Sequence, residues 1–248
     1  MTAPHTLAAR ARRGSATEGR STDELKAIVS HVGAELELAP AEDIIEWAVA
    51  TFGGRFCVTS SMSDAVLSHI ASKVAPGIDV VFLDTGYHFA EKVGTRDAVE
   101  ATMPVNLISI TPVQSVVEQD ATYGKDLYKR DPDLCCKLRK VQPLEEGLAA
   151  YDAWATGLRR AETHNRVIAP VVGWDEKKQK VKVSPLARWS DEDVEKYIAE
   201  NGILVNPLQY DGYPSIGCWP CTQRVAPGED ARSGRWVGSN KTECGIHQ

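Results

Sequence analysis

The sequence has no hydrophobic run long enough to cross a membrane, because no stretch approaches the roughly 18 uninterrupted apolar residues that a membrane helix needs. No apolar segment follows the N-terminus, so we expect no secretory signal. The net charge is −6, which argues against a general nucleic-acid binder but leaves room for a local basic pocket. We therefore expect a cytoplasmic protein that binds neither membranes nor nucleic acid. A homo-oligomer is compatible with the sequence.

Cysteine is also scarce. Six cysteines are too few for a disulfide scaffold in a chain of 248 residues, so a metal or redox role is the better interpretation. Hydrophobic residues make up 43% and charged residues 25% of the chain, which are ordinary values for a globular protein and exclude wholesale disorder and coiled coil. The length is sufficient for one large domain with a substantial core.

The hydrophobic pattern alternates between short buried strands and amphipathic helices, which predicts βαβ units and an α/β fold with a mostly parallel sheet flanked by helices. We expect strands at 55–60, 78–84, 105–110 and 153–156. We expect helices at 22–31, 41–51, 64–74, 89–103, from 112, at 134–149, and between a cap at Ser190 and a stop at Gly202. Residues 177–183 resemble half of an exposed hairpin, and 205–248 should be irregular.

The pattern also predicts the organisation of the chain. Residues 1–20 are rich in small and polar residues and are expected to be a disordered tail, with a transit peptide as the less favoured alternative. Residues 21–240 should form a single α/β domain. Residues 241–248 are expected to be a mobile tail that carries chemistry.

Two polar turns follow neighbouring predicted strands. The first is SSMSDAV at 60–66, and the second is LDTGYHF at 83–89. Ligands of open parallel sheets bind at the carboxyl ends of the strands, so both turns should face one crevice suited to an anion or a nucleotide. Helix N-caps and ordinary turn residues are the alternatives.

The cysteine spacing is a sharper signal. Cys135 and Cys136 are adjacent, and Cys218 and Cys221 form a CxxC pair. Two tight thiolate pairs predict a tetrathiolate site for zinc or for an iron–sulfur cluster. Neighbouring side chains splay apart, which suits a cluster better than a single zinc ion. Buried inert cysteines or a disulfide are the remaining interpretations.

A further cysteine, Cys244, is the fifth residue from the end of the sequence, beside Gly245 and close to His247. A thiolate there would be nucleophilic if positive charge helped its ionisation, whereas the alternative is a surface cysteine on a frayed end. Nine basic residues accompany these motifs, and we expect about four of them to line an anion pocket. They are Lys137, Arg139, Lys140, Arg159, Arg160, Arg166, Arg224, Arg232 and Arg235. Cys57 should be an ordinary core residue.

Together these motifs resemble one known family over roughly residues 40–248. The motifs are SMSDAV, VFLDTG, CCKLRKVQPL, WATGLRR, GCWPCT and ECGIH. The chain resembles the iron–sulfur-dependent, thioredoxin-dependent adenosine 5′-phosphosulfate (APS) reductases of assimilatory sulfate reduction and cysteine biosynthesis. Homologues that reduce the 3′-phosphorylated substrate (PAPS) keep the terminal motif but generally lack the four cluster cysteines. The resemblance implies an adenine nucleotide alpha hydrolase-like (PP-loop) fold.

The resemblance also implies roles for individual residues. The ligands of one [4Fe–4S] cluster per subunit would be Cys135, Cys136, Cys218 and Cys221. The catalytic residues would be Cys244, which is the nucleophile, Lys140, which lies between cluster and substrate, and His247. Contacts to the substrate would come from Ser61, Ser63, Leu83, Gly157, Arg166, Arg232 and Arg235, of which the last two, with His247, hold the phosphosulfate. Asp64 follows Ser63 directly, where the family commonly has a glycine.

The implied reaction is attack of Cys244 on the sulfur of APS, followed by release of sulfite by thioredoxin. We keep three alternatives: a PAPS reductase, an ATP-pyrophosphatase-like nucleotidyl- or sulfur-transfer enzyme, and a zinc-stabilised nucleotide-binding or redox-sensing module. The second would consume ATP, and the third would be colourless and would not need Cys244.

Overall fold

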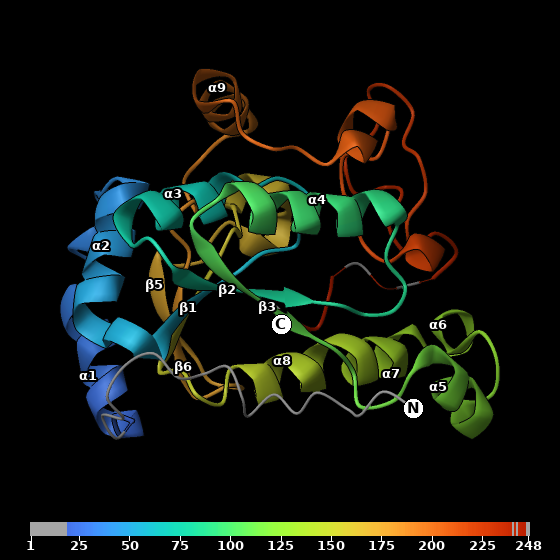
Figure 1. The fold of residues 1–248 in the computed structure, drawn as a ribbon, viewed down its shortest axis with the longest axis horizontal. Helices are drawn as coiled ribbons and strands as arrows, with labels where there is room; N and C mark the ends of the chain where they lie inside the picture. The colour runs from blue at the N-terminus through green and yellow to red at the C-terminus, as the bar shows by residue number, and fades with distance from the viewer. Residues whose placement is uncertain (1–18, 240, 242, 247–248) are drawn as a thin grey trace.

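The computed structural model describes residues 19–239, 241 and 243–246 of the chain. A six-stranded sheet runs through the middle of these residues in the order β3-β2-β1-β4-β6-β5 (Figure 1). The strands are β1 (Phe56–Thr59), β2 (Ile78–Leu83), β3 (Val105–Ile110), β4 (Ala153–Thr156), β5 (Val172–Asp175) and β6 (Lys180–Val183). Neighbouring strands are parallel except for the β5–β6 pair. The α/β fold with a mostly parallel sheet is therefore confirmed.

Helices cover both faces of the sheet, as Figure 1 shows, with α3 and α4 above it and α8 and α7 below it. The longer helices are α1 (Thr22–Val32), α2 (Ala41–Phe52), α3 (Val66–Val74), α4 (Ala90–Thr102), α5 (Val116–Tyr123) and α9 (Asp191–Asn201). The shorter ones are α6 (Leu127–Arg130), α7 (Pro132–Cys136), the π-helical turn η4 (Lys137–Val141) and α8 (Gln142–Gly147). Beyond α9 the chain forms mostly loops with two 3₁₀ turns, Pro207–Asp211 and Trp219–Cys221, as expected.

The core divides between the two faces because strand side chains alternate. In β2, Val80 and Phe82 join the large cluster under α1, α2, α3 and α4, whereas Val81 joins the smaller cluster against α8. Trp154 and Cys57 belong to that smaller cluster and are fully buried, which confirms Cys57 as a core residue. Burial of these apolar side chains fixes the register of the strands.

Most sequence-predicted elements are confirmed, including the strand Val105–Ile110 and the capping box of Ser190 with Asp193. The hairpin at 177–183 exists, but its predicted exposure is wrong. Strand β6 lies between β4 and β5, and Val181 and Val183 are fully buried. The alternation of lysine and valine indicates one buried face and does not reveal that both strand edges are paired.

The continuous helix predicted at 134–149 is also wrong in detail, because the π-helical turn η4 interrupts it. Pro143 cannot donate a hydrogen bond to the carbonyl of Arg139, and its ring crowds that carbonyl, which accounts for a wider turn. The wide turn carries Lys140 inward, so that this lysine is only 9% exposed.

The expected disordered tail at 1–20 lies outside the described residues up to position 18. Its last residue, Arg20, is described and is held: its guanidinium contacts Asp152 and donates to the Thr51 carbonyl. The ordered domain therefore begins slightly before residue 21. Within the part of the chain that the structure describes, no helix has the length and hydrophobicity to cross a membrane.

Candidate active site

The order of the strands gathers the predicted nucleotide contacts at one edge of the sheet. Strand β1 lies between β2 and β4, parallel to both. Ser61 and Ser63 follow β1, Leu83 ends β2 and Gly157 follows β4. The chain adds strands on one side of β1 and then crosses to the other side, so this edge contains a topological switch point, where open α/β sheets bind ligands.

The first polar turn, after β1, does not cap the following helix. Helix α3 has no side-chain cap, and the Ser61 and Ser63 hydroxyls lie 3.3 Å from each other. Met62 takes a left-handed backbone conformation, with φ of 56°, which favours glycine in other proteins. Asn206 supports the turn, because its Nδ2 donates to the Met62 carbonyl at 3.1 Å. The N-cap alternative for these serines is therefore wrong.

The four paired cysteines lie on two segments that approach each other. Cys135 and Cys136 are in α7, whereas Cys218 precedes the 3₁₀ turn Trp219–Cys221 and Cys221 ends it. Burial, followed by the charges of Cys218 and Cys221, raises the pKa of Cys135 to about 11. Burial and Cys218 also raise the pKa of Cys221. The described cysteines are all free thiols, so the disulfide alternative is not realised here.

Four thiols are chemically a donor set for an iron–sulfur cluster: Cys135, Cys218 and Cys221 lie close enough to affect one another, and the buried Lys140 would balance a negatively charged cluster. Within the described residues, no group of three or more His, Cys, Asp or Glu side chains could hold a metal ion as placed. Ligation would therefore require the four side chains to adjust from these positions.

Cys244 lies against this cysteine group. The Cys136 thiol donates a hydrogen bond to the Cys244 sulfur. The positive charges of Lys140 and Arg235 also stabilise the ionised form of Cys244. These groups, with a backbone hydrogen bond from Ile246, hold the pKa of Cys244 well below its ordinary value in spite of burial. The same contact raises the pKa of Cys136. The charges of Lys140 and Arg235, which do not depend on the Cys136 proton, thus favour the Cys244 thiolate, which is the nucleophilic form.

Lys140 is the central cation of the site. Burial alone lowers its pKa, but the electrostatic interactions with Cys218, Cys244 and Cys136 outweigh burial, so the pKa lies above its ordinary value. Lys140 therefore stays charged among the thiols. A buried, permanently charged amine beside a thiolate is a preorganised electrostatic group.

Four of the nine basic residues lie close to Cys244 or to the preceding Glu243, namely Lys140, Arg166, Arg232 and Arg235. Whether they line an anion pocket stays a prediction. Three others pair elsewhere: Arg159 with Asp191, Arg160 with Glu37 and Arg224 with Asp211. Arg139 supports the second turn by donating to the Thr85 carbonyl at 2.5 Å, and Lys137 is exposed.

Arg235 occupies a space that a glycine leaves open. Its guanidinium carbon lies 4.4 Å from the centre of the Trp236 ring, and its Nη1 donates to Ser215 at 3.1 Å. A Cβ atom on Gly217 would lie 2.3 Å from Nη2 of Arg235. The buried Nε of Arg235 has no hydrogen-bond partner among the described residues, which leaves a donor available for an anion.

The tail that carries Cys244 is docked on the domain in this structure. Glu243 is paired with Arg166 at 2.9 Å and with Arg232 at 3.0 Å, and the carbonyl of Ile246 accepts from Lys178 at 3.1 Å. Burial alone would raise the pKa of Glu243, but Arg166, the Cys244 amide and Arg232 hold it below its ordinary value. His247 lies outside the described residues, so its predicted role stays a prediction, as does motion of the tail.

Sequence reasoning missed three residues at this site. Lys92 on α4 is buried, and its Nζ donates to the Ile216 carbonyl at 2.9 Å. Burial lowers the pKa of Lys92 to about 7, helped by the charges of Arg235 and Lys140, although Cys218 acts in the opposite direction. Asn206 and Glu243 are the other two. Only Glu243 had a signal in the sequence, because it precedes Cys244 in the quoted terminal motif.

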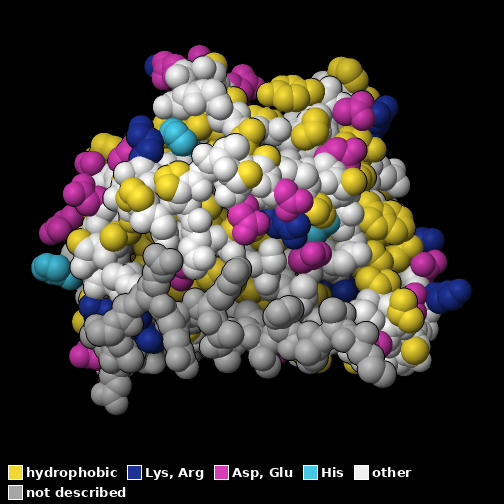
Figure 2. All heavy atoms as spheres, in the orientation of Figure 1, with side chains coloured by type: hydrophobic (Ala, Val, Ile, Leu, Met, Phe, Trp, Pro, Cys, Tyr) yellow, Lys and Arg dark blue, Asp and Glu magenta, His cyan; other side chains and the backbone are white. Residues whose placement is uncertain are grey.

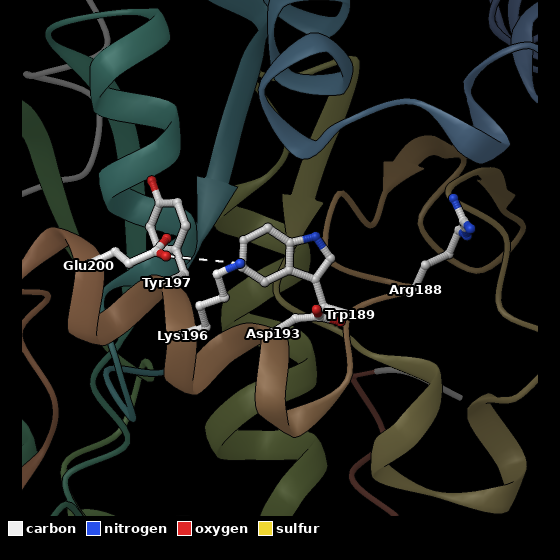
Figure 3. Close-up of a pocket in the computed structure, with 6 residues that line it drawn as sticks. All are labelled: Arg188, Trp189, Asp193, Lys196, Tyr197 and Glu200. Atoms are coloured by element: carbon white, nitrogen blue, oxygen red, sulfur yellow. Dashed lines mark ion pairs between the residues drawn. The ribbon is translucent and has the colours of Figure 1, made fainter.

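Two further features lie on the surface of the domain. Hydrophobic side chains gather at the right of the view in Figure 2. Trp219, in the C-terminal segment, is half exposed. A hollow of about 330 Å³ lies beside α9, where Lys196 and Glu200 point toward each other at 3.9 Å (Figure 3). None of the sequence-predicted site residues lines this hollow.

Comparisons with known proteins agree with the resemblance. The family model for the phosphoadenosine phosphosulfate reductase domain matches residues 55–224. An adenosine 5′-phosphosulfate reductase of Streptomyces coelicolor is 66% identical over 93% of this chain and 98% of its own, and one of Mycolicibacterium smegmatis is 55% identical over 91% and 95%. A crystal structure of phosphoadenylyl-sulfate (PAPS) reductase from Candida auris, a phosphate complex, has a TM-score of 0.67 and 28% identity over 79% of this chain and 96% of that one. The chain belongs to the adenosine 5′-phosphosulfate reductase family.

Proposed function

We propose that this protein reduces adenosine 5′-phosphosulfate to sulfite and AMP, with Cys244 as the nucleophile and thioredoxin as the electron donor. The names of the relatives at 66% and 55% identity support the substrate. The observation that carries the residue assignment is the position of Cys244, whose thiol lies against Cys136 beside Lys140 and Arg235. We further propose that the reaction takes place in the cytoplasm, as part of sulfate assimilation.

The first step is a displacement at sulfur. The Cys244 thiolate attacks the sulfur of the substrate, the bond between that sulfur and the bridging oxygen breaks, and AMP leaves with the oxygen and its electron pair. Cys244 then carries an S-sulfonate. Charge grows on the departing phosphate, so Lys140, Arg232 and Arg235 should stabilise the transition state more than the bound substrate.

The second step releases the product. A thiolate of reduced thioredoxin attacks the Cys244 sulfur, and sulfite leaves with the electron pair of the sulfur–sulfur bond. The second thioredoxin thiol then reduces the mixed disulfide, which regenerates the Cys244 thiolate and leaves oxidised thioredoxin. Two electrons therefore pass from thioredoxin to the sulfonyl sulfur. The tail must close for the first step and open for the second.

The carboxyl edge of the sheet supports a nucleotide-binding role for the residues around it. We assign adenosine contacts to Ser61, Ser63, Leu83, Gly157 and, through the ribose, Arg166. The open space at Gly157, where an added Cβ would meet nothing within 4 Å, leaves room for a ligand. We assign the phosphosulfate to Arg232, Arg235 and His247.

Steady-state kinetics with both nucleotides test the substrate assignment. With thioredoxin and its reductase, kcat/KM for APS should exceed kcat/KM for PAPS by at least roughly 100-fold, because a 3′-phosphate needs its own cationic contacts. A preference for PAPS would contradict the proposal. A requirement for ATP would indicate the nucleotidyl- or sulfur-transfer alternative.

We also propose that Cys135, Cys136, Cys218 and Cys221 hold one [4Fe–4S] cluster per chain. When bound, the cluster would supply an electrostatic field and a fixed scaffold, while thioredoxin supplies the electrons. Crowding of buried thiols beside Lys140 supports this assignment. Lys140 would then lie between the cluster and the departing phosphate, and its positive charge would stabilise both of these negative groups.

The cluster proposal predicts a brown protein. Anaerobically purified protein should absorb broadly near about 400 nm and contain about four iron and about four sulfide per chain. Cys221→Ala should lose the absorption, whereas Cys57→Ala, which changes a buried cysteine outside the site, should keep it. A colourless wild-type protein that binds zinc and turns over fully would contradict the assignment.

A substitution at Gly217 should weaken binding of the phosphate group. Because a Cβ atom at this position would displace the Arg235 guanidinium, Gly217→Ala should raise the Kd for AMP by roughly tenfold, the loss expected for one charge-assisted hydrogen bond. Calorimetry measures this change. Gly94→Ala is the control, because its new Cβ would meet nothing within 4 Å. Equal affinity in both variants would remove Arg235 from the phosphate site.

A further inference from the structure

Glu243 is the residue before the proposed nucleophile, and it is buried although it is charged. Its side chain is almost fully covered, with an exposed fraction of 7%. A buried carboxylate is costly unless cations and hydrogen-bond donors surround it. Its environment must therefore supply those groups.

Two arginines supply most of that environment. Arg166 donates through Nε to one carboxylate oxygen of Glu243 at 3.1 Å and through Nη2 to the other at 2.9 Å. Arg232 donates through Nη2 to the second oxygen at 3.0 Å. A two-point contact of guanidinium with carboxylate fixes direction as well as distance, so the position of Glu243 is well defined relative to the domain.

The carboxylate also fixes the backbone of the nucleophile. The amide of Cys244 donates to Oε1 of Glu243 at 2.9 Å, and this oxygen is the same one that Arg166 and Arg232 share. The position of the Cys244 backbone thus depends directly on the two arginines. On the other side of Cys244, the Ile246 carbonyl is held by Lys178, and the Ile246 side chain packs on the core cluster under α8.

We propose that Glu243 is a positioning residue that latches the catalytic tail: its carboxylate bridges Arg166, Arg232 and the Cys244 amide, and so holds the Cys244 sulfur over the anion site. This inference rests on the proposed function, since it takes Cys244 as the nucleophile. Arg166 and Arg232 are also assigned to the substrate. Closure of the tail and occupation of the nucleotide site therefore involve the same two guanidinium groups.

The test removes the charge of Glu243 and keeps the shape of its side chain. Glu243→Gln in the anaerobic holoenzyme should lower kcat by roughly tenfold or more while changing KM by less than about threefold, because the nucleophile is displaced while the nucleotide contacts that do not involve Arg166 or Arg232 remain. Labelling of Cys244 by a neutral alkylating reagent without nucleotide should become several-fold faster. Wild-type kcat and labelling in this variant would overturn the latch.

Glu162→Gln is the matched control. Glu162 also pairs with Arg166, at 2.5 Å, but it does not lie on the tail, so this variant should leave the labelling rate of Cys244 unchanged. Equal acceleration in both variants would mean that the charge of Arg166 matters and the latch does not. Thermal melting and the visible spectrum of each variant establish that it is folded and loaded.

A measurement on the wild-type protein keeps the proposal independent of any variant. Hydrogen exchange followed by mass spectrometry should find the Cys244 amide protected, because it is hydrogen-bonded to a buried carboxylate. Exchange at the rate of a free peptide would overturn the latch. If Cys244→Ser still produced sulfite, the proposed function would fail, whereas labelling and exchange at Cys244 would continue to report on the latch.

Discussion

The Cys244→Ser protein should produce no measurable sulfite from APS and thioredoxin. A serine hydroxyl has nearly the same shape but does not ionise near neutral pH, so Lys140 and Arg235 cannot convert it into a nucleophile. The loss should be complete within the sensitivity of the assay. Sulfite release measured with thioredoxin, thioredoxin reductase and NADPH, together with the visible spectrum, checks this result.

The spectrum and AMP binding should survive the substitution. Cys244 is not among the four proposed ligands, so the absorption near about 400 nm should remain, and the Kd for AMP should change little. Cys57→Ala is the control for loss of a thiol elsewhere, because Cys57 lies in the core against α8. Sulfite formation by Cys244→Ser at the wild-type rate would refute the nucleophile assignment.

Lys140→Met should lower turnover by about 100-fold or more, as expected for loss of one preorganised charge in a buried site. Methionine keeps the length and the apolar stem of lysine but removes the charge that Cys218, Cys244 and Cys136 surround. The pKa of Cys244 should rise toward its ordinary value, since Lys140 is one of the groups that lower it. The rate of Cys244 alkylation as a function of pH measures that shift.

Lys137→Met provides the comparison for this experiment. Lys137 begins the same π-helical turn but is exposed, so its loss should leave turnover within about twofold of wild type. Unchanged turnover in Lys140→Met would remove Lys140 from the active site. Equal losses in both variants would point to the turn itself rather than to the buried charge.

The fold was largely predictable because its core elements have strong local signals. Continuous apolar runs marked the central parallel strands, and the capping box at Ser190 and the stop at Gly202 marked the ends of α9. Whether Lys180–Val183 is an edge or an inner strand depends on pairing with β4, a contact distant in sequence. The π-helical turn has a local cause, because Pro143 interrupts the helical hydrogen bonds there, but the hydrophobic pattern does not reveal it.

The parts of the site that depend on the spacing of cysteines in the sequence were predictable, whereas the parts that depend on contacts between distant residues were not. The cysteine pairs and Cys244 stand out as motifs, and the structure brings Cys136 and Cys244 into contact across more than a hundred residues. Lys92 has no such signal, because only the fold reveals that it is buried beside Ile216. Glu243 was visible in the motif, but its role requires the positions of two arginines.

Mass spectrometry of the protein after reaction with APS in the absence of thioredoxin tests the central claim most directly. Without the reductant, the S-sulfonate should accumulate, and the peptide that contains Cys244 should gain the mass of one SO₃ group while AMP appears in equal amount. Addition of thioredoxin should remove the adduct and release sulfite. An adduct on another cysteine, or AMP release without any adduct on Cys244, would contradict the account.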